Sequence, residues 1–277
     1  MKNILVPVDF SAFSFNAARK AVFIAEKTNA EVHLLHVVNA PSDWNSISLQ
    51  AQQEFPEVEA RVVEAEMKME KLLNDAIFER SKVKTYVQGG TIYEVITEFA
   101  RHRKMDLITI GAHGADETKE LFVGSTTQRV IRMATCPVLS VKKNSELKSV
   151  DRILFLSDFE EDISNAIETI IQLAEIMAAS VELLYINTPA NFTDTETAEA
   201  RMSKYIPKAS KVKFQSFIYN DFDKDKGMLA FMKRNKPDLI TMITHARKGK
   251  PAYLLSMTDT IVFHADIPVL SMVLRKP

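Results

Sequence analysis

The sequence predicts an α/β protein made of two tandem Rossmann-like domains, each a parallel five-stranded sheet with helices on both faces. Short apolar runs rich in Val, Ile and Leu alternate with longer helical patterns, which is typical of buried parallel strands joined by right-handed helical crossovers. Segments of the first half recur in the second half in the same order. The length of 277 residues also suits two domains of ordinary size better than one.

The recurring segments indicate a duplicated domain. The paired segments are NILVPVDFS (3–11) with RILFLSDFE (152–160), EVHLLHVV (31–38) with SVELLYIN (180–187), and MDLITIGAHG (105–114) with PDLITMITHA (237–246). Their separation falls from 149 residues at the first pair to 132 at the third, so the order is kept while the connecting loops shorten. We therefore expect domains at 1–143 and 150–277, with the polar stretch KKNSELKS (142–149) as the linker.

The elements of the first half follow from its apolar pattern. The expected strands are ILVPV (4–8), VHLLHVV (32–38), VKTYV (83–87), LITIG (107–111) and PVLSV (137–141). Between the second and third strands, apolar residues in steps of three and four predict one buried helical stripe, formed by Val58, Val62, Ala65, Met69, Leu72 and Ala76. A second helical run, STTQRVIRMA (125–134), precedes the fifth strand.

Three of the chain's seven glycines, Gly111, Gly114 and Gly124, cluster around the carboxyl end of the fourth strand. Ligands of such sheets bind at this edge. Gly124 opens a helical run, so Gly124, Ser125 and Thr126 are expected to present amides and hydroxyls to a phosphate. We expect Gly111 and Gly114 to adopt strained dihedrals and to let the backbone pass close to a nucleotide. The alternative is a glycine turn and a helix cap without a ligand.

Composition excludes several classes of function. A formal net charge of −1 without a long Lys/Arg run argues against nucleic acid or membrane partners. The apolar start of the chain is too short for a signal sequence, which predicts a cytoplasmic protein. The sequence contains neither a P-loop motif nor the G-x-G-x-x-G of dinucleotide-binding folds.

These residues resemble the universal stress protein family in its tandem, two-domain form. The resemblance rests on VDFS with Asp9, and on a G-x₂-G-x₉-G-S/T motif that Gly111, Gly114, Gly124 and Ser125 match at every position. It implies the adenine nucleotide alpha hydrolase-like version of the fold and a bound ATP, or ADP or AMP, with or without magnesium. It further implies that Asp9 and Val37 contact the adenine end, that the glycine loop holds ribose and phosphates, and that the tandem chain forms a homodimer.

Two groups of residues have open alternatives. Asp9 ends the first strand before Ser11, a candidate N-cap, so it could serve as a ligand contact or as a turn and cap residue. Gly89 and Gly90 follow the third strand and could bring backbone near a ribose, or could form a simple turn.

The second copy departs from the motif. Asp158 remains, but Ile243, Ala246 and Leu255 replace the three glycines and only Ser256 remains of the hydroxyl pair. A bulky residue at the position of close backbone approach predicts no ATP in this half.

Other signals have simpler interpretations. DFDKDKG (221–227) resembles a calcium loop, but its glycine is one position late and Met232 stands where a bidentate Glu is needed, so a solvated turn is expected. His33 and His36 are three residues apart on a strand and face opposite sides, which argues against a shared metal. Near His113 no nucleophile and acid partner is evident, and Lys119 reads as a surface lysine or a phosphate contact.

The expected function is an ATP-binding stress-response regulator that binds without efficient turnover, because the motif supplies amides and hydroxyls but no clear base or metal ligands for phosphoryl transfer. At most it would be a slow ATPase. The alternative is a nucleotide-independent interaction or scaffold protein.

Overall fold

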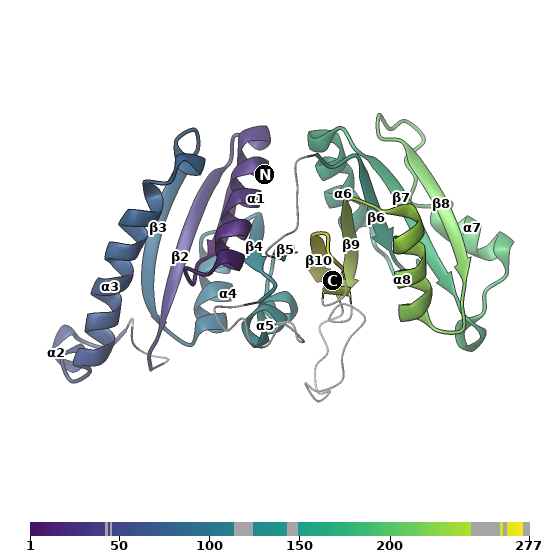
Figure 1. Ribbon diagram of the computed structural model, residues 1–277. Coiled ribbons are helices and arrows are strands. Elements are labelled where there is room, and N and C mark those ends of the chain that lie inside the picture. The colour runs from purple at the N-terminus through teal and green to yellow at the C-terminus, as the bar shows by residue number, and fades with distance from the viewer. Residues whose placement is uncertain are drawn as a thin grey trace. The chain divides into compact units, whose positions relative to one another are not determined.

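The computed structural model describes residues 1–41, 44, 46–113, 124–142, 149–244, 261–262 and 265–273. The chain forms two compact units, Met1–Asn144 and Ser145–Pro277 (Figure 1). The elements of unit 1 are β1 (Asn3–Pro7), α1 (Ala12–Thr28), β2 (Glu31–Asn39), α2 (Leu49–Gln52), α3 (Pro56–Leu73), a 3₁₀ turn (Ala76–Phe78), β3 (Lys82–Gly90), α4 (Ile92–His102), β4 (Leu107–Gly111), α5 (Ser125–Met133) and β5 (Val138–Val141). Those of unit 2 are β6 (Arg152–Leu156), α6 (Ser164–Met177), β7 (Ser180–Asn187), a 3₁₀ turn (Pro189–Asn191), α7 (Thr195–Ser203), β8 (Phe214–Asn220), α8 (Lys224–Asn235), β9 (Leu239–Thr244) and β10 (Val269–Val273).

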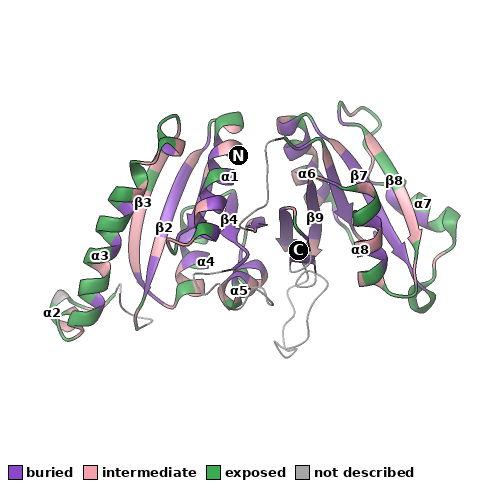
Figure 2. Ribbon diagram, viewed as in Figure 1, coloured by how far each residue is buried: buried purple, intermediate pink, exposed green. Residues whose placement is uncertain are grey.

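Each unit has a parallel sheet, as the apolar runs predict. The strand order is β3-β2-β1-β4-β5 in unit 1 and β10-β9-β6-β7-β8 in unit 2, with parallel pairs throughout each order. Right-handed crossovers place α1 and α3 on one face of the first sheet and α4 with α5 on the other, where α4 and α5 pack against each other. The strands next to the middle of each order are buried, whereas β3 and β8 are largely half-exposed (Figure 2).

The duplication is visible in unusual backbone positions. The described non-glycine residues with positive φ form three aligned pairs: Phe10 with Phe159, Asn29 with Ala178, and Lys104 with Lys236. They are separated by 149, 149 and 132 residues, as the sequence repeats predict.

A second shared feature lies at the amino edge of each sheet. The Asp106 carboxylate accepts hydrogen bonds from the amides of Lys2 (2.6 Å) and Asn3 (2.9 Å), tying the start of β1 to the start of β4. Asp238 accepts from the amides of Asp151 (3.0 Å) and Arg152 (2.9 Å) in the same way. The two units therefore share their local geometry as well as their order of elements.

The predicted stripe of the long helix is correct except at its end. Val58, Ala65 and Met69 are buried in α3, which begins with Pro56 at a position where the missing amide costs nothing. Ala76 lies outside the helix, in the 3₁₀ turn, and is exposed. Asp75 starts this separate turn by accepting a hydrogen bond from the Ile77 amide at 3.1 Å.

The chain's only tryptophan packs on Gly89. Trp44 is buried in a cluster with Val38 and Val58, and a Cβ at Gly89 would lie 2.1 Å from its Cδ1 atom. We expect Gly89→Ala to displace the indole, shift its fluorescence emission to longer wavelength and destabilise unit 1 by about 2 kcal/mol. Urea unfolding followed by fluorescence measures both effects. An unchanged emission spectrum would contradict the contact.

Candidate functional site

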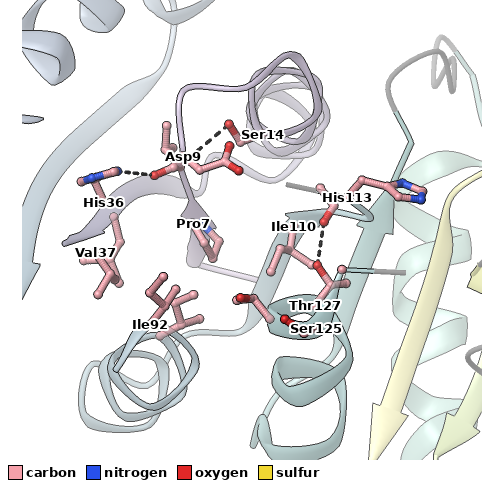
Figure 3. A pocket seen from close by; sticks show the side chains of 16 residues that line it. Pro7, Asp9, Ser14, His36, Val37, Ile92, Ile110, His113, Ser125 and Thr127 are labelled. Carbon is pink, nitrogen blue, oxygen red and sulfur yellow. Dashed lines mark hydrogen bonds between the residues drawn. The ribbon is translucent and has the colours of Figure 1, made fainter. Parts of the chain in front are cut away.

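A pocket of about 340 Å³ opens at the carboxyl ends of β1, β2 and β4 in unit 1. Figure 3 shows the strand-end residues Asp9 and His36 on one side of it and Ser125 and Thr127 of α5 on the other. The lining residues are Pro7, Val8, Asp9, Ser14, Leu35, His36, Val37, Ile92, Ile96, Ile110, Gly111, His113, Gly124, Ser125, Thr126 and Thr127.

Six of the seven predicted site residues line this one pocket. They come from β1, β2, β4 and α5 and comprise Asp9, Val37, Gly111, Gly124, Ser125 and Thr126. The seventh, Gly114, lies outside the described residues, as does Lys119. Strand ends far apart in the sequence thus meet at the edge where the topology places ligands.

Asp9 serves the turn that starts α1 and also faces the pocket. Its Oδ1 atom accepts hydrogen bonds from the amide (3.0 Å) and hydroxyl (2.6 Å) of Ser11, and Ser11 in turn caps α1 by accepting from the Ser14 amide at 3.2 Å. Phe10 completes this turn with a φ of 63°, a strained conformation for an aromatic residue. The Oδ2 atom of Asp9 has no hydrogen bond among the described residues and remains available to a ligand.

The expected strained dihedral at Gly111 is wrong. Gly111 does not have a positive φ; the only described glycine that does is Gly90, at 139°. A Cβ at Gly111 would instead lie 2.9 Å from Cβ and 3.0 Å from the backbone carbon of Phe13. Glycine is needed here because the start of α1 packs directly on the end of β4.

The amide of Gly124 is not free for a phosphate, contrary to the sequence expectation. It donates to the Ala112 carbonyl at 3.0 Å, which joins the start of α5 to the end of β4. Thr127, which sequence reasoning missed, strengthens this junction because its hydroxyl donates to the Gly111 carbonyl at 2.8 Å. Ser125 and Thr126 remain as the pocket-lining residues of the first turn of α5, at the positive end of the helix.

An apolar wall completes the pocket. Ile92 and Ile96 from α4 and Ile110 from β4 line it together with Val37. Ile92 is 36% exposed, so part of its aliphatic side chain is open to solvent. Its position two residues after Gly90, at the start of α4, was the sequence signal that could have identified it. The wall and the α5 terminus together give the pocket one apolar half and one half lined by the amino end of a helix.

Gly89 and Gly90 are not among the pocket's lining residues. Gly89 lies against Trp44, and Gly90 has a positive φ just before α4, where a Cβ would lie 2.8 Å from Val95. Both glycines are the last residues of β3, where they pair with Val38 and Asn39 of β2, so the strand runs further than the sequence predicts and the turn begins only after Gly90.

His36 is a second pocket residue that the motif did not identify. Its Nδ1–H donates to the Val8 carbonyl at 2.7 Å, and its ring centroid lies 4.7 Å from that of Phe10. Burial lowers the pKa of His36 from its usual 6.5, outweighing the opposing effects of that hydrogen bond and of Asp9. His33 lies apart from it, contacting Tyr86 and Asn3, and burial also lowers its pKa.

These lowered pKa values predict acid sensitivity of unit 1. Both histidines stay neutral in the folded state at pH values where the unfolded chain takes up protons, so their contribution to stability is present above pH 6.5 and is lost as the pH falls toward their lowered values. We expect urea midpoints to fall between pH 7.5 and about 5.5. His36→Asn, which keeps a donor for Val8, should show a smaller fall. A midpoint that rises on acidification would contradict this.

Unit 2 differs from unit 1 at the aligned positions. Ile243 is half-buried where Gly111 stands in unit 1, and α6 starts at Ser164, three residues later in the alignment than α1. Lys224 replaces the apolar Ile92. Asp158 still accepts from the amide two residues on, at 3.3 Å, while Ala246, Leu255 and Ser256 lie outside the described residues.

The described residues offer no metal centre. They contain no group of three or more His, Cys, Asp or Glu side chains placed to hold an ion. In the calcium-like segment, Asp223 caps α8 by accepting from the Lys226 amide at 3.0 Å. Every helix in the described part of the chain is too short or too polar to cross a bilayer.

Comparisons with known proteins agree with this architecture. A crystal structure of a universal stress protein from Archaeoglobus fulgidus matches 97% of this chain and 95% of its own length with a TM-score of 0.73 and 19% identity, a likeness of fold over both units. Universal stress protein MJ0531 of Methanocaldococcus jannaschii is 34% identical over 150 residues, which is 51% of this chain and 82% of that protein. Another universal stress protein, solved in complex with cAMP, is 20% identical over 50% of this chain and 96% of its own, with a TM-score of 0.36. The model of the universal stress protein family matches residues 1–142. Because that match spans more than half of the sequence, the chain belongs to the universal stress protein family.

Proposed function

We propose that unit 1 binds ATP or a related adenine nucleotide, and that the chain is a tandem universal stress protein acting as a cytoplasmic stress-response regulator. The observation that carries this proposal is the meeting of Asp9, Val37, Gly111, Ser125 and Thr126 around one pocket. Those residues carry the nucleotide-binding motif of the family.

The two halves of the pocket suit the two halves of a nucleotide. The aliphatic side chains of Val37, Ile92 and Ile96 offer a flat base an apolar surface, and the free Oδ2 of Asp9 offers an acceptor for a base amine or a ribose hydroxyl. The first turn of α5 offers Ser125 and Thr126 to the phosphates. Magnesium would be held by the phosphates, with a hydroxyl of this turn as the available protein ligand.

Binding without efficient turnover fits this lining. Phosphoryl transfer needs a positioned base and strong charge stabilisation around the phosphates. Among the described residues that line the pocket, Asp9 is the only carboxylate and none is Lys or Arg. Asp9 is also engaged in the turn with Ser11. We propose that nucleotide bound in the pocket, with hydrolysis at most slow, changes the contacts that the protein makes with its partners.

Calorimetric titration of the nucleotide-stripped protein with ATP and magnesium tests this function. We expect about one ATP per chain, because Ile243 replaces the critical glycine of unit 2. Two sites per chain would contradict the silent second unit, and no heat at millimolar ATP would reject nucleotide binding.

A nucleotide-independent scaffold is the second candidate, and the altered edge of unit 2 favours it. With Ile243 and Lys224 at the aligned pocket positions, that unit retains the fold without the site. The chain would then present its surfaces to partners, most simply as a homodimer. Light scattering after size exclusion, with and without ATP, measures the oligomeric state; a dimer that forms equally without nucleotide favours the scaffold.

A further inference from the structure

Arg129 lies exposed on α5, and its only contact among the described residues is with an aromatic ring. Its guanidinium carbon is 4.6 Å from the centroid of the Tyr93 ring, and it has no ion pair with a carboxylate in the described part of the chain. The Tyr93 hydroxyl donates to Glu94 at 3.0 Å, which fixes the ring. An exposed arginine resting on a fixed aromatic surface is a pre-positioned positive charge.

The positions of Arg129 and Tyr93 in their helices place this positive charge near the pocket. Arg129 follows Ser125 by four residues in α5, so both lie on the same face of the helix. Helical side chains lean toward the amino end of their helix, which brings the guanidinium toward the turn that carries Ser125. Tyr93 is the neighbour of Ile92 in the first turn of α4, and Ile92 lines the pocket. The cation therefore lies at the side of the pocket where the first turns of α4 and α5 meet.

The charge balance of the pocket leaves a role for this cation. The described lining residues include one carboxylate, Asp9, and no Lys or Arg. The amino end of α5 supplies only about half a unit of positive charge. A triphosphate carries more negative charge than a single phosphate and extends further along the pocket, and the phosphate oxygens that magnesium does not bind can pair with a guanidinium.

We propose that Arg129 pairs with the terminal phosphates of the bound nucleotide, so that the pocket distinguishes nucleotides by the length of their phosphate chain. Tyr93 holds the guanidinium beside the first turns of α4 and α5, where a di- or triphosphate can reach it. This inference rests on the proposed nucleotide binding in unit 1 and assigns to that site a preference for ATP over AMP.

Titration of the full chain with AMP, ADP and ATP, each with magnesium, tests the assignment. We expect Arg129→Gln to weaken ATP binding about tenfold while AMP binding changes less than about twofold. Arg129→Lys should recover part of the loss, because it keeps the charge without the planar fork. The salt dependence of ATP binding should also be shallower in the glutamine variant.

Arg103→Gln is the matched control. Arg103 also stacks on a tyrosine, 4.6 Å from the Tyr86 ring, but it follows the last residue of α4 at the opposite edge of the sheet. It should leave the affinities for all three nucleotides unchanged. Thermal unfolding of each variant checks that the fold is retained.

The outcomes separate this inference from the proposed function. If Arg129→Gln weakens AMP and ATP equally, or neither, the assignment of Arg129 is overturned while nucleotide binding stands. If the unaltered protein binds none of the three, the proposed function fails, and the role of Arg129 is rejected with it. A selective loss of ATP affinity supports both.

Discussion

Replacing Ser125 by aspartate is expected to weaken ATP binding about 100-fold without destabilising the protein. Ser125 is the first residue of α5 and lines the pocket. A carboxylate there would meet the phosphates at short range, and like charges brought together in a partly enclosed site cost several kcal/mol. The same carboxylate interacts favourably with the positive end of the helix and should stabilise unit 1 by about 0.5 kcal/mol.

The opposite signs of the two effects make this variant informative. Ser125→Asn is the matched control because asparagine has nearly the same size and shape as aspartate but no charge. We expect it to lose only the contribution of the serine hydroxyl, about tenfold at most. Calorimetric titration and urea unfolding on the three proteins measure both effects. Equal affinities for Ser125→Asp and Ser125→Asn would place the phosphates elsewhere.

The second large effect is expected at Gly111, where alanine should destabilise unit 1 by about 2 kcal/mol. At unstrained positions, replacing glycine by alanine usually stabilises a protein slightly by restricting the unfolded chain. Here the added Cβ would lie 3.0 Å from the backbone carbon of Phe13 and 3.1 Å from the carbonyl oxygen of His113. Backbone atoms cannot avoid the added Cβ by a change of rotamer, as a side chain can, so α1 must shift away from β4.

Urea unfolding measures the loss, and the two units provide an internal comparison. Gly111→Ala should lower the unfolding midpoint of unit 1. Ile243→Ala, at the aligned position of unit 2, adds no atoms and should leave the unit 1 transition unchanged. A Gly111→Ala protein as stable as the unaltered chain would show that the junction of α1 with β4 is looser than these distances indicate.

The sequence predicts the repeated architecture well because repetition is a property of the sequence itself. The separations of 149 and 132 residues between paired segments reappear as the separations of Phe10 from Phe159 and of Lys104 from Lys236. The placement of Asp9, Val37 and Ser125 around one pocket also follows from a general rule, since parallel strands present their carboxyl ends at one edge.

The contacts that escaped prediction join residues far apart in the sequence. Nothing near Gly89 indicates that Trp44 lies over it, and nothing near Gly111 indicates that Phe13 excludes a side chain there. The motif correctly singled out Gly111 but for the wrong physical reason, because a spacing pattern cannot distinguish a strained dihedral from a close approach. The Gly124 amide was misassigned in the same way, since its partner, the Ala112 carbonyl, lies twelve residues earlier in the sequence.

The aspartates at the amino edges of the sheets have a consequence for protein engineering. Asp106 and Asp238 each join the first strand of their unit to the fourth by accepting hydrogen bonds from two backbone amides. The carboxyl edges of the two sheets, by contrast, carry different side chains. The hydrogen bonds that join these strands at the amino edge are thus separate from the carboxyl edge, where the pocket of unit 1 lies. Side chains at the carboxyl edge that do not pack against another element can therefore be redesigned while these bonds keep the first and fourth strands together.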